Sequence, residues 1–371
     1  MKIKETKNKR INYFVTALAV LVIVLVIFFI QKSKANPQIN AENGMPELKE
    51  GKYPKAPDFA GIEKWINSEP LKMEQLKGKV VLVDFWTYTC INCIRTLPYL
   101  KEWDKKYRDD GLVIVGVHTP EFEFEKKYEN VANAVNDYSI KYPVAQDNDY
   151  ATWRAYQNRY WPHKFLIDID GFIRYDHIGE GNYDETEKII QSLLNERMDR
   201  LNKKNGINQN ITKPSETTEF QKIGTPEIYF GYQFDRGNLG YDKIQPDSIG
   251  NYEISQNPYK NYVYLKGQWK YNADNMELIS DEGEIFLIFD AKKVNIVAGS
   301  DNKSDAFVFL DSDFMNEKTK GDDTYLKDGN SIVDINEYKL YNIASAEDYG
   351  THTVELQVAG KGFKIYTFTF G

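Results

Sequence analysis

A pair of cysteines between a buried strand and a helix restricts the possible folds more than anything else in this chain. Residues 80–86 (VVLVDFW) are a run of strand-forming residues, and four positions later the chain reaches Cys90-Ile91-Asn92-Cys93. From Cys90 to Tyr107 apolar residues recur at spacings of three and four, which predicts an amphipathic helix. This order of elements indicates an α/β domain with two thiols at a helix N-terminus.

These are the only two cysteines among 371 residues, which excludes a multi-disulfide scaffold and a cysteine-rich zinc module. Backbone N–H groups at a helix start stabilise a thiolate, so we expect a lowered pKa for Cys90. The Cys93 thiol is then within reach to release a mixed disulfide. A structural disulfide or half a zinc site is the alternative. However, so short a loop restrains little entropy, and the four histidines lack ligand spacing. We predict a redox-active dithiol without metal or other cofactor.

Strands and helices continue to alternate after Tyr107. Buried or half-buried strands are predicted over 112–117, 164–169 and 173–178, and helices over 126–138 and from Asp184 to 201. Asp170-Gly171 is a hairpin turn signal between the last two strands. Glu187, three residues after Asp184, suggests a capping box at the start of the last helix.

The composition changes after residue 201. Residues 202–219 contain no aromatic residue and are predicted to be a linker. Residues 220–371 are rich in aromatics and show short alternating runs separated by turn signals: 261–265, 284–290, 306–310, 353–358 and 364–370. This pattern predicts an all-β sandwich or jelly roll.

The N-terminal region predicts a membrane segment. Tyr13–Ile30 is an uncharged run of 18 residues, about 27 Å long as a helix. A basic flank precedes it, so the N-terminus is expected inside and all that follows outside the cytoplasmic membrane. A signal peptide cleaved near Ala35, which would release a secreted protein, is the alternative. Residues 1–35 are therefore the tail and anchor, and 36–55 a tether. The remaining chain is acidic, which argues against nucleic acid as a partner.

Residues 83–93 (VDFWTYTCINC) resemble the active-site segment of thioredoxin-like proteins of the TlpA/ResA type, in particular the exported region of DipZ-type proteins with its signature WTY(S/T)CINC. The likeness continues at 95–99, 118–122, 147–153, 158–162 and 225–232. It implies a thioredoxin fold over 56–201 and a carbohydrate-module-like β domain over 220–371. DipZ-type proteins carry a CcdA-like electron-transfer module ahead of this region, whereas only one hydrophobic segment is present here.

The resemblance also implies roles for individual residues. Cys90 would be the nucleophile and Cys93 the resolving thiol, and Pro162 matches the cis-proline that faces them. Asp84 matches a buried acid that accepts the proton of Cys93, and Glu121 an acid that raises thiol pKa values. The alternatives are a strand-entry proline, a solvent-facing aspartate and a solvated loop glutamate.

Four further residues are expected to line the substrate groove: Trp86, Ile91, Asn92 and Trp161. Trp161 is bulkier than the residue before the cis-proline in many thioredoxins, which bears on specificity. A core position is the alternative for Trp86.

Together these observations predict a membrane-anchored, extracytoplasmic thiol–disulfide oxidoreductase that reduces disulfides of exported proteins. The substrate stays open among an apocytochrome in cytochrome c biogenesis, a wall or spore protein and another redox carrier. A separate CcdA-like membrane protein is the expected electron donor. One alternative is a peroxiredoxin-like peroxidase, although Val83 stands where that pattern has proline. The other is a protein whose β domain binds cell-wall glycan.

Overall fold

The computed structural model describes residue 49 and residues 51–203, 206–213 and 222–371. The expected membrane segment and the cleavage site near Ala35 lie outside these residues. Among the residues that are described, no helix is both long and apolar enough to cross a membrane. Residues 50–371 group together as one unit of the chain, and this unit holds a mixed α/β part and an all-β part.

The α/β part is built on a six-stranded sheet with the order β1-β4-β3-β2-β5-β6. β2 (Val80–Trp86) runs parallel to β3 (Leu112–His118) and antiparallel to β5 (His163–Ile167). All seven residues of β2 are buried, as expected for a central strand covered on both faces. The other strands are β1 (Lys64–Ile66), β4 (Val144–Gln146) and β6 (Ile173–Ile178).

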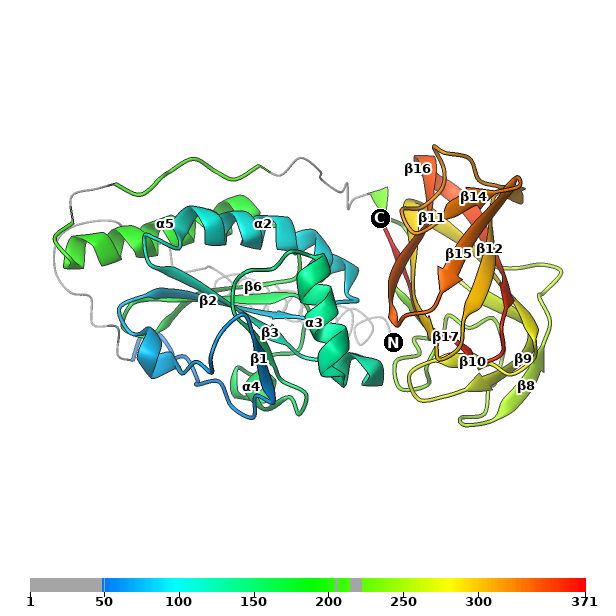
Figure 1. The fold of residues 1–371 in the computed structure, drawn as a ribbon, viewed down its shortest axis with the longest axis horizontal. Coiled ribbons are helices and arrows are strands. Elements are labelled where there is room, and N and C mark those ends of the chain that lie inside the picture. The colour runs from blue at the N-terminus through cyan, green and yellow to red at the C-terminus, as the bar shows by residue number, and fades with distance from the viewer. Residues whose placement is uncertain (1–48, 50, 204–205, 214–221) are drawn as a thin grey trace, which may run out of the picture. The chain divides into compact units, whose positions relative to one another are not determined.

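Helices cover both faces of this sheet. α2 (Ile91–Tyr107), α3 (Tyr128–Asp137) and α5 (Tyr183–Arg200) share one core with the even-numbered apolar residues of β2, and Figure 1 shows α2 and α5 along the same side of the sheet. The short α4 (Ala151–Ala155) packs with the odd-numbered residues. Because side chains alternate along a strand, Asp84 lies on the face of β2 that α2 covers. These elements form the expected thioredoxin fold.

The predicted elements of this part are largely confirmed. The strands expected over 80–86 and 173–178 agree to the residue, and Asp170-Gly171 forms the turn between β5 and β6 with Gly171 at φ +86°. The helix expected over 126–138 is α3, Tyr128–Asp137, and a separate 3-10 turn, Glu123–Lys126, precedes it.

The expected capping box at the start of α5 is wrong. The helix begins at Tyr183, after Asn182 in the left-handed conformation, and no side chain caps it. Glu187 instead accepts hydrogen bonds from the Tyr107 hydroxyl and the Lys106 ammonium, at 2.8 and 2.7 Å. Its carboxylate therefore joins α5 to α2, because a buried tertiary partner competes with the local cap.

Residues 222–371 form the all-β part, with eleven strands in one hydrogen-bonded sheet. The main path is β14-β15-β12-β16-β11-β17-β10-β9-β8, with β13 beside β12 and β7 beside β17. The strands are β7 (Ile228–Tyr229), β8 (Ile249–Tyr252), β9 (Val263–Tyr271), β10 (Met276–Leu278), β11 (Glu282–Ser300), β12 (Ser304–Leu310), β13 (Asp313–Phe314), β14 (Tyr325–Lys327), β15 (Asn330–Ile335), β16 (Lys339–Ala359) and β17 (Phe363–Phe370).

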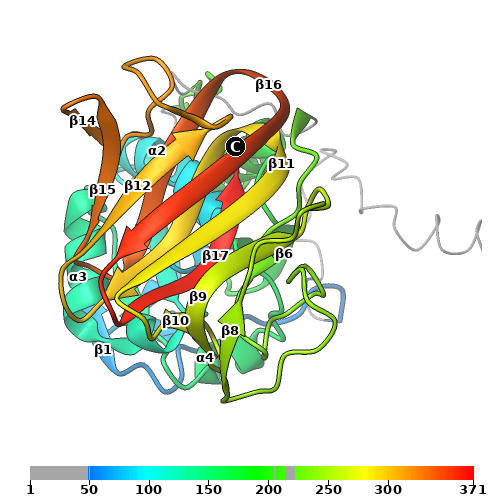
Figure 2. The same cartoon turned by 90° about the vertical axis from the view of Figure 1, so that its right-hand side faces the viewer.

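Two long strands distinguish this sheet from the short strands that the sequence predicts. β11 and β16 have 19 and 21 residues and pair along most of their length, and Figure 2 shows them running side by side across the domain. The first half of β11 also pairs with β9 and its second half with β17. Irregularities between Ala291 and Asn295 let β11 change partners. The prediction of an all-β domain is confirmed, but its strands belong to one continuous sheet rather than two.

We expect the core between α2 and the sheet to carry much of the stability of the α/β part. Leu100→Ala should lower the free energy of unfolding by about 2–5 kcal/mol, because Leu100 is fully buried. Leu201→Ala, at a leucine that is 48% exposed, is the matched control and should change it by much less. Denaturant unfolding followed by circular dichroism measures both, and equal losses would contradict the assignment of the core.

Candidate active site

The two cysteines stand at the junction of β2 and α2. Cys90 is the N-cap of α2, and its sulfur accepts a hydrogen bond from the backbone N–H of Cys93 at 3.2 Å. Both are free thiols. Cys90 is 9% exposed and Cys93 1% exposed, so Cys90 is the more accessible of the two sulfurs and fits the nucleophile.

The electrostatics differ from the expected lowering of the Cys90 pKa. Burial raises the pKa of Cys90, the hydrogen bond from Cys93 opposes this, and the negative charges of Glu227 and Glu121 add to it. Burial, together with the neighbouring Cys90 and Asp84, raises the pKa of Cys93 well above its ordinary value. The expectation is wrong because the helix N-terminus acts on a desolvated sulfur beside carboxylates. Both thiols are protonated at neutral pH, so each needs a base.

Asp84 is a buried acid whose charge acts on Cys93. It is 1% exposed, and burial raises its pKa to about 7 while the positive charge of Lys164 on β5 opposes the shift. One of its oxygens, Oδ1, has no hydrogen-bond partner among the described residues. Lys164 is itself buried and donates to the Gly179 carbonyl at 2.9 Å. Asp84 is thus the buried acid that the resemblance implied, and it can exchange a proton near neutral pH.

Pro162 follows a cis peptide bond from Trp161, as the resemblance implied. It is buried and stands immediately before β5, the strand that pairs with β2. Its carbonyl accepts a hydrogen bond from the Gly179 N–H at 2.7 Å. The indole N–H of Trp161 donates to the Thr119 carbonyl at 3.0 Å, and its ring packs on Trp153 with centroids 4.3 Å apart. The partly buried Trp161 is therefore held in one orientation.

The expected groove residues separate into two sets. Ile91 and Asn92 are partly exposed at the start of α2, and a cavity of about 1330 Å³ reaches Ile91. Trp86, in contrast, is fully buried, and its ring meets His118 edge-on at 5.4 Å. The expectation that Trp86 lines the groove is wrong, because it occupies an inward-facing position of β2 under α2.

Glu121 belongs to a group of acids that sequence reasoning found only in part. Burial raises the pKa of Glu121 to about 8, and the charges of Glu125 and Glu227 add to the shift. The Tyr229 hydroxyl hydrogen-bonds with Glu121 Oε1 at 2.8 Å. Glu227 and Tyr229 lie in the run 225–232 that carried the resemblance, so the sequence marked this run as a family motif. However, nothing in the sequence indicated that the run lies near Cys90.

Histidine does not supply a base close to these thiols. His118 is fully buried, and burial lowers its pKa to about 3, so it stays neutral. Its Nε2 lies 3.3 Å from the Thr87 hydroxyl and its ring stacks on Tyr88. His163 hydrogen-bonds with Asn158 and Asp176 at 2.7 and 2.9 Å. Both histidines therefore have structural partners.

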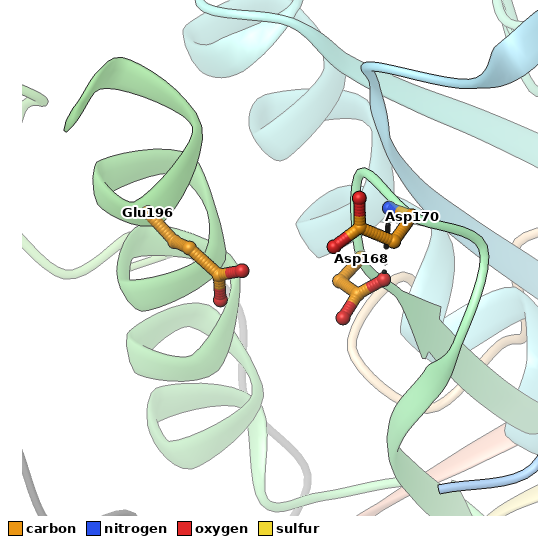
Figure 3. Close-up of side chains that lie close together, drawn as sticks. All are labelled: Asp168, Asp170 and Glu196. Atoms are coloured by element: carbon orange, nitrogen blue, oxygen red, sulfur yellow. Dashed lines mark hydrogen bonds between the residues drawn. The ribbon is translucent and has the colours of Figure 1, made fainter. Parts of the chain in front are cut away.

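One acidic cluster among the described residues brings three carboxylates together: Asp168, Asp170 and Glu196. Figure 3 shows Glu196 on α5 facing the two aspartates in the turn after β5. Arg174 pairs with Asp168 and Glu196, and Arg200 pairs with Asp170. Arginine side chains thus compensate these charges, and the cluster fastens α5 to the hairpin.

Two family models match the chain. The AhpC/TSA family matches residues 54–176, and the family described as thioredoxin like C-terminal domain matches residues 225–371. The first region lies within the α/β part and ends before α5, and the second lies within the all-β part.

Curated relatives agree with this division. Protein DipZ of Mycobacterium tuberculosis is 33% identical over 335 residues, which cover 85% of this chain and 43% of DipZ. The chain thus spans less than half the length of the DipZ protein. The thiol-disulfide oxidoreductase ResA of Bacillus cereus is 31% identical over 138 residues, covering 37% of this chain and 76% of ResA. YkuV of Bacillus subtilis, also a thiol-disulfide oxidoreductase, is 28% identical over 140 residues, 38% of this chain and 94% of YkuV. The chain therefore belongs to the thioredoxin-like family of TlpA-, ResA- and DipZ-type proteins.

Proposed function

We propose that the protein is a thiol–disulfide oxidoreductase that reduces disulfides of exported proteins. The observation that carries this proposal is the pair of free thiols at the start of α2, with buried Asp84 on the covered face of β2. The ResA and YkuV relatives, both described as thiol-disulfide oxidoreductases, support it.

The reaction transfers two electrons from the dithiol to the substrate disulfide. Cys90 gives its proton to a neighbouring carboxylate, and its thiolate attacks one sulfur of the substrate. The other substrate sulfur leaves as a thiolate and takes up a proton. Cys93 then gives its proton to Asp84 and attacks the Cys90 sulfur. The second substrate thiol is released, and a Cys90–Cys93 disulfide remains.

The raised thiol pKa values favour reduction of substrates over their oxidation. A strongly oxidising dithiol site owes its potential to a reduced form that is stabilised as a thiolate. Burial and the carboxylates beside Cys90 instead destabilise the thiolate. The dithiol of this protein is therefore expected to give up its electrons more readily than the dithiol of a strongly oxidising site.

We further propose that Tyr13–Ile30 anchors the protein and that the redox domain works outside the cytoplasmic membrane. The substrate would be a disulfide in an apocytochrome, a wall or spore protein, or another redox carrier. Since nicotinamide is not available there, the oxidised pair needs a membrane dithiol carrier of the CcdA type.

A peroxidase is the second candidate, favoured by the match to the AhpC/TSA family over residues 54–176. Thr87 stands three residues before Cys90, and its hydroxyl lies near His118. Val83, at the proline position of the peroxiredoxin pattern, is a fully buried residue of β2. The site therefore carries only half of that pattern.

Binding of cell-wall glycan by the β domain is a third candidate. Tyr259 and Tyr262 are 72% and 40% exposed, and their ring centroids lie 6.4 Å apart. Exposed tyrosine rings of this kind can stack on sugars. Sedimentation with purified cell wall tests this candidate, and loss of binding in Tyr259→Ala would support it.

The roles of the two thiols predict opposite results for their serine variants. Cys90→Ser should abolish reduction of a model protein disulfide, because the attacking sulfur is gone. Cys93→Ser should still attack and should accumulate mixed disulfides on non-reducing gels. Equal trapping by Cys90→Ser would contradict the assignment, with the double variant as background. Peroxide consumption without any disulfide reduction would support the peroxidase instead.

Asp84→Asn should slow release of the mixed disulfide at least about tenfold at pH 7.5, because Cys93 loses its base. In the unchanged protein this rate should rise through the Asp84 pKa of about 7, and the variant should lose that rise. The pKa exceeds its ordinary 3.8, so ionisation costs folding free energy as the pH rises from about 4 to 7.

The same variant should therefore be more stable than the unchanged protein at pH 8 but not at pH 4. Asp104→Asn changes another buried aspartate, on α2 beside Arg108, and is the control for both measurements. An unchanged pH–rate profile in Asp84→Asn would return Asp84 to a structural role.

The proposed electron source predicts the redox state in cells. Deleting a CcdA-like membrane protein should leave Cys90 and Cys93 oxidised, as read by thiol-labelling gel shifts. The expected intermediate is a transient disulfide between Cys90 and that partner. A pair that stays reduced without the partner would contradict this dependence. A pair that is oxidised even in unmodified cells would favour an oxidase.

A further inference from the structure

A continuous series of hydrogen bonds leads from one side of Cys90 to the other through residues of the β domain. Asn92, inside the CINC motif, donates its side-chain amide to Glu227 Oε1 at 3.4 Å. The Tyr229 hydroxyl joins Glu227 to Glu121. On the other side, Thr89 donates to Glu125 Oε1 at 2.6 Å, and Glu125 Oε2 accepts from the Glu121 N–H at 2.6 Å.

The Tyr229 hydroxyl has two carboxylate neighbours and one proton. It lies 2.8 Å from Glu121 Oε1 and 3.2 Å from Glu227 Oε2. A hydroxyl donates to one acceptor only, so the second contact is a hydrogen bond when that carboxyl group is protonated and donates to the phenol oxygen. The geometry therefore fits one additional proton at Glu121.

The charges around Glu121 also favour the protonated form of its carboxyl group. Glu125 and Glu227 oppose its ionisation, and the Arg236 guanidinium, 4.7 Å from the Tyr229 ring centroid, offsets them in part. The Cys90 sulfur and the hydroxyls of Tyr150 and Tyr229 also feel the charge of Glu121. With three acids against one guanidinium, a neutral Glu121 relieves the repulsion.

Packing holds Tyr229 in this position. The residue is 6% exposed, and β7, which contains it, pairs with β17 at Thr367 and Phe368. Its ring contacts those of Phe122, from the loop that carries Glu121, and Phe234, with centroids 6.4 and 5.7 Å away. The contact between Tyr229 and Glu121 is thus part of a buried aromatic cluster rather than a surface encounter.

We propose that Glu227 and Tyr229 are positioning residues of the redox site, through which the β domain sets the charge of Glu121 beside Cys90. The role in redox catalysis rests on the proposed function, whereas the contacts among Glu121, Glu227 and Tyr229 do not depend on it. Glu227 adds negative charge near the Cys90 sulfur, and the Tyr229 hydroxyl holds the Glu121 carboxyl group in place. The β domain then restrains the reactivity of the Cys90 thiol, in addition to any role in binding.

The test is the pH dependence of Cys90 alkylation by iodoacetamide in the reduced full-length protein, read by mass spectrometry. Glu227→Gln removes a charge that disfavours the thiolate. Tyr229→Phe removes the hydroxyl that helps Glu121 to ionise. Both variants should therefore move the profile to lower pH. A shift of one pH unit corresponds to an alkylation rate about tenfold faster below the midpoint.

Matched variants separate this effect from a general loosening of the structure. Tyr366→Phe changes a buried tyrosine that packs on Phe122 at 5.0 Å, and the described part of the structure shows no carboxylate bonded to its hydroxyl. Glu284→Gln removes a charge of the same domain that pairs with Lys266. Neither control should move the profile. Equal shifts in the controls, or no shift in either test variant, would overturn the proposal.

A double variant shows whether Tyr229 acts through Glu121. Glu121→Gln alone should also move the profile to lower pH, and Tyr229→Phe should add nothing to it if the two residues form one unit. Full additivity would overturn the coupling. Because alkylation needs no substrate disulfide, a shifted profile in a protein without reductase activity would reject the proposed function and keep this inference. Normal reductase activity with unshifted alkylation profiles would support the proposed function and reject this inference.

Discussion

Burial of two thiols at the junction of β2 and α2 is the constraint on which the rest of the site depends. A thiol at a helix N-terminus is usually activated by the helix, yet Cys90 is only 9% exposed and its pKa is raised by burial. Desolvation outweighs the helix because a charged sulfur loses hydration that a few N–H groups only partly replace. A protonated Cys93 then needs a proton acceptor, and the proposed acceptor is Asp84 on β2.

The sequence predicted the parts of this arrangement that depend on local pattern. The strand over 80–86 was correct to the residue because every position is buried, which leaves a run that is apolar at every position except Asp84. The family resemblance supplied Asp84, Glu121 and Pro162, and the structure places Asp84 in the core and Pro162 after a cis bond. The pattern around Trp86 did not reveal which side of β2 it faces relative to the groove.

What the sequence did not predict depends on contacts between distant residues. Tyr229 meets Glu121 across 108 positions, and no local periodicity records such a pair. Glu187 satisfied the capping-box pattern but bonds with Tyr107 instead, since a tertiary partner competes with the cap. In the β domain, the expected short runs 284–290 and 353–358 are segments of β11 and β16. Turn-like residues inside those long strands mark irregular pairing rather than chain reversal.

The acids near Cys90 also give a reason why the α/β part and the all-β part occur in one chain. Glu121 and Glu125 come from the loop and the 3-10 turn after β3, but the hydroxyl that joins Glu121 to Glu227 comes from β7. Without Tyr229, the Glu121 carboxyl would lose its one side-chain hydrogen bond in the described structure. Without Glu227, the side-chain amide of Asn92 would likewise lose its partner. The cost of leaving such groups unpaired beside a buried sulfur is about 1–3 kcal/mol each. The β domain therefore completes the polar surroundings of Cys90, and selection on thiol reactivity would act on both parts of the chain at once.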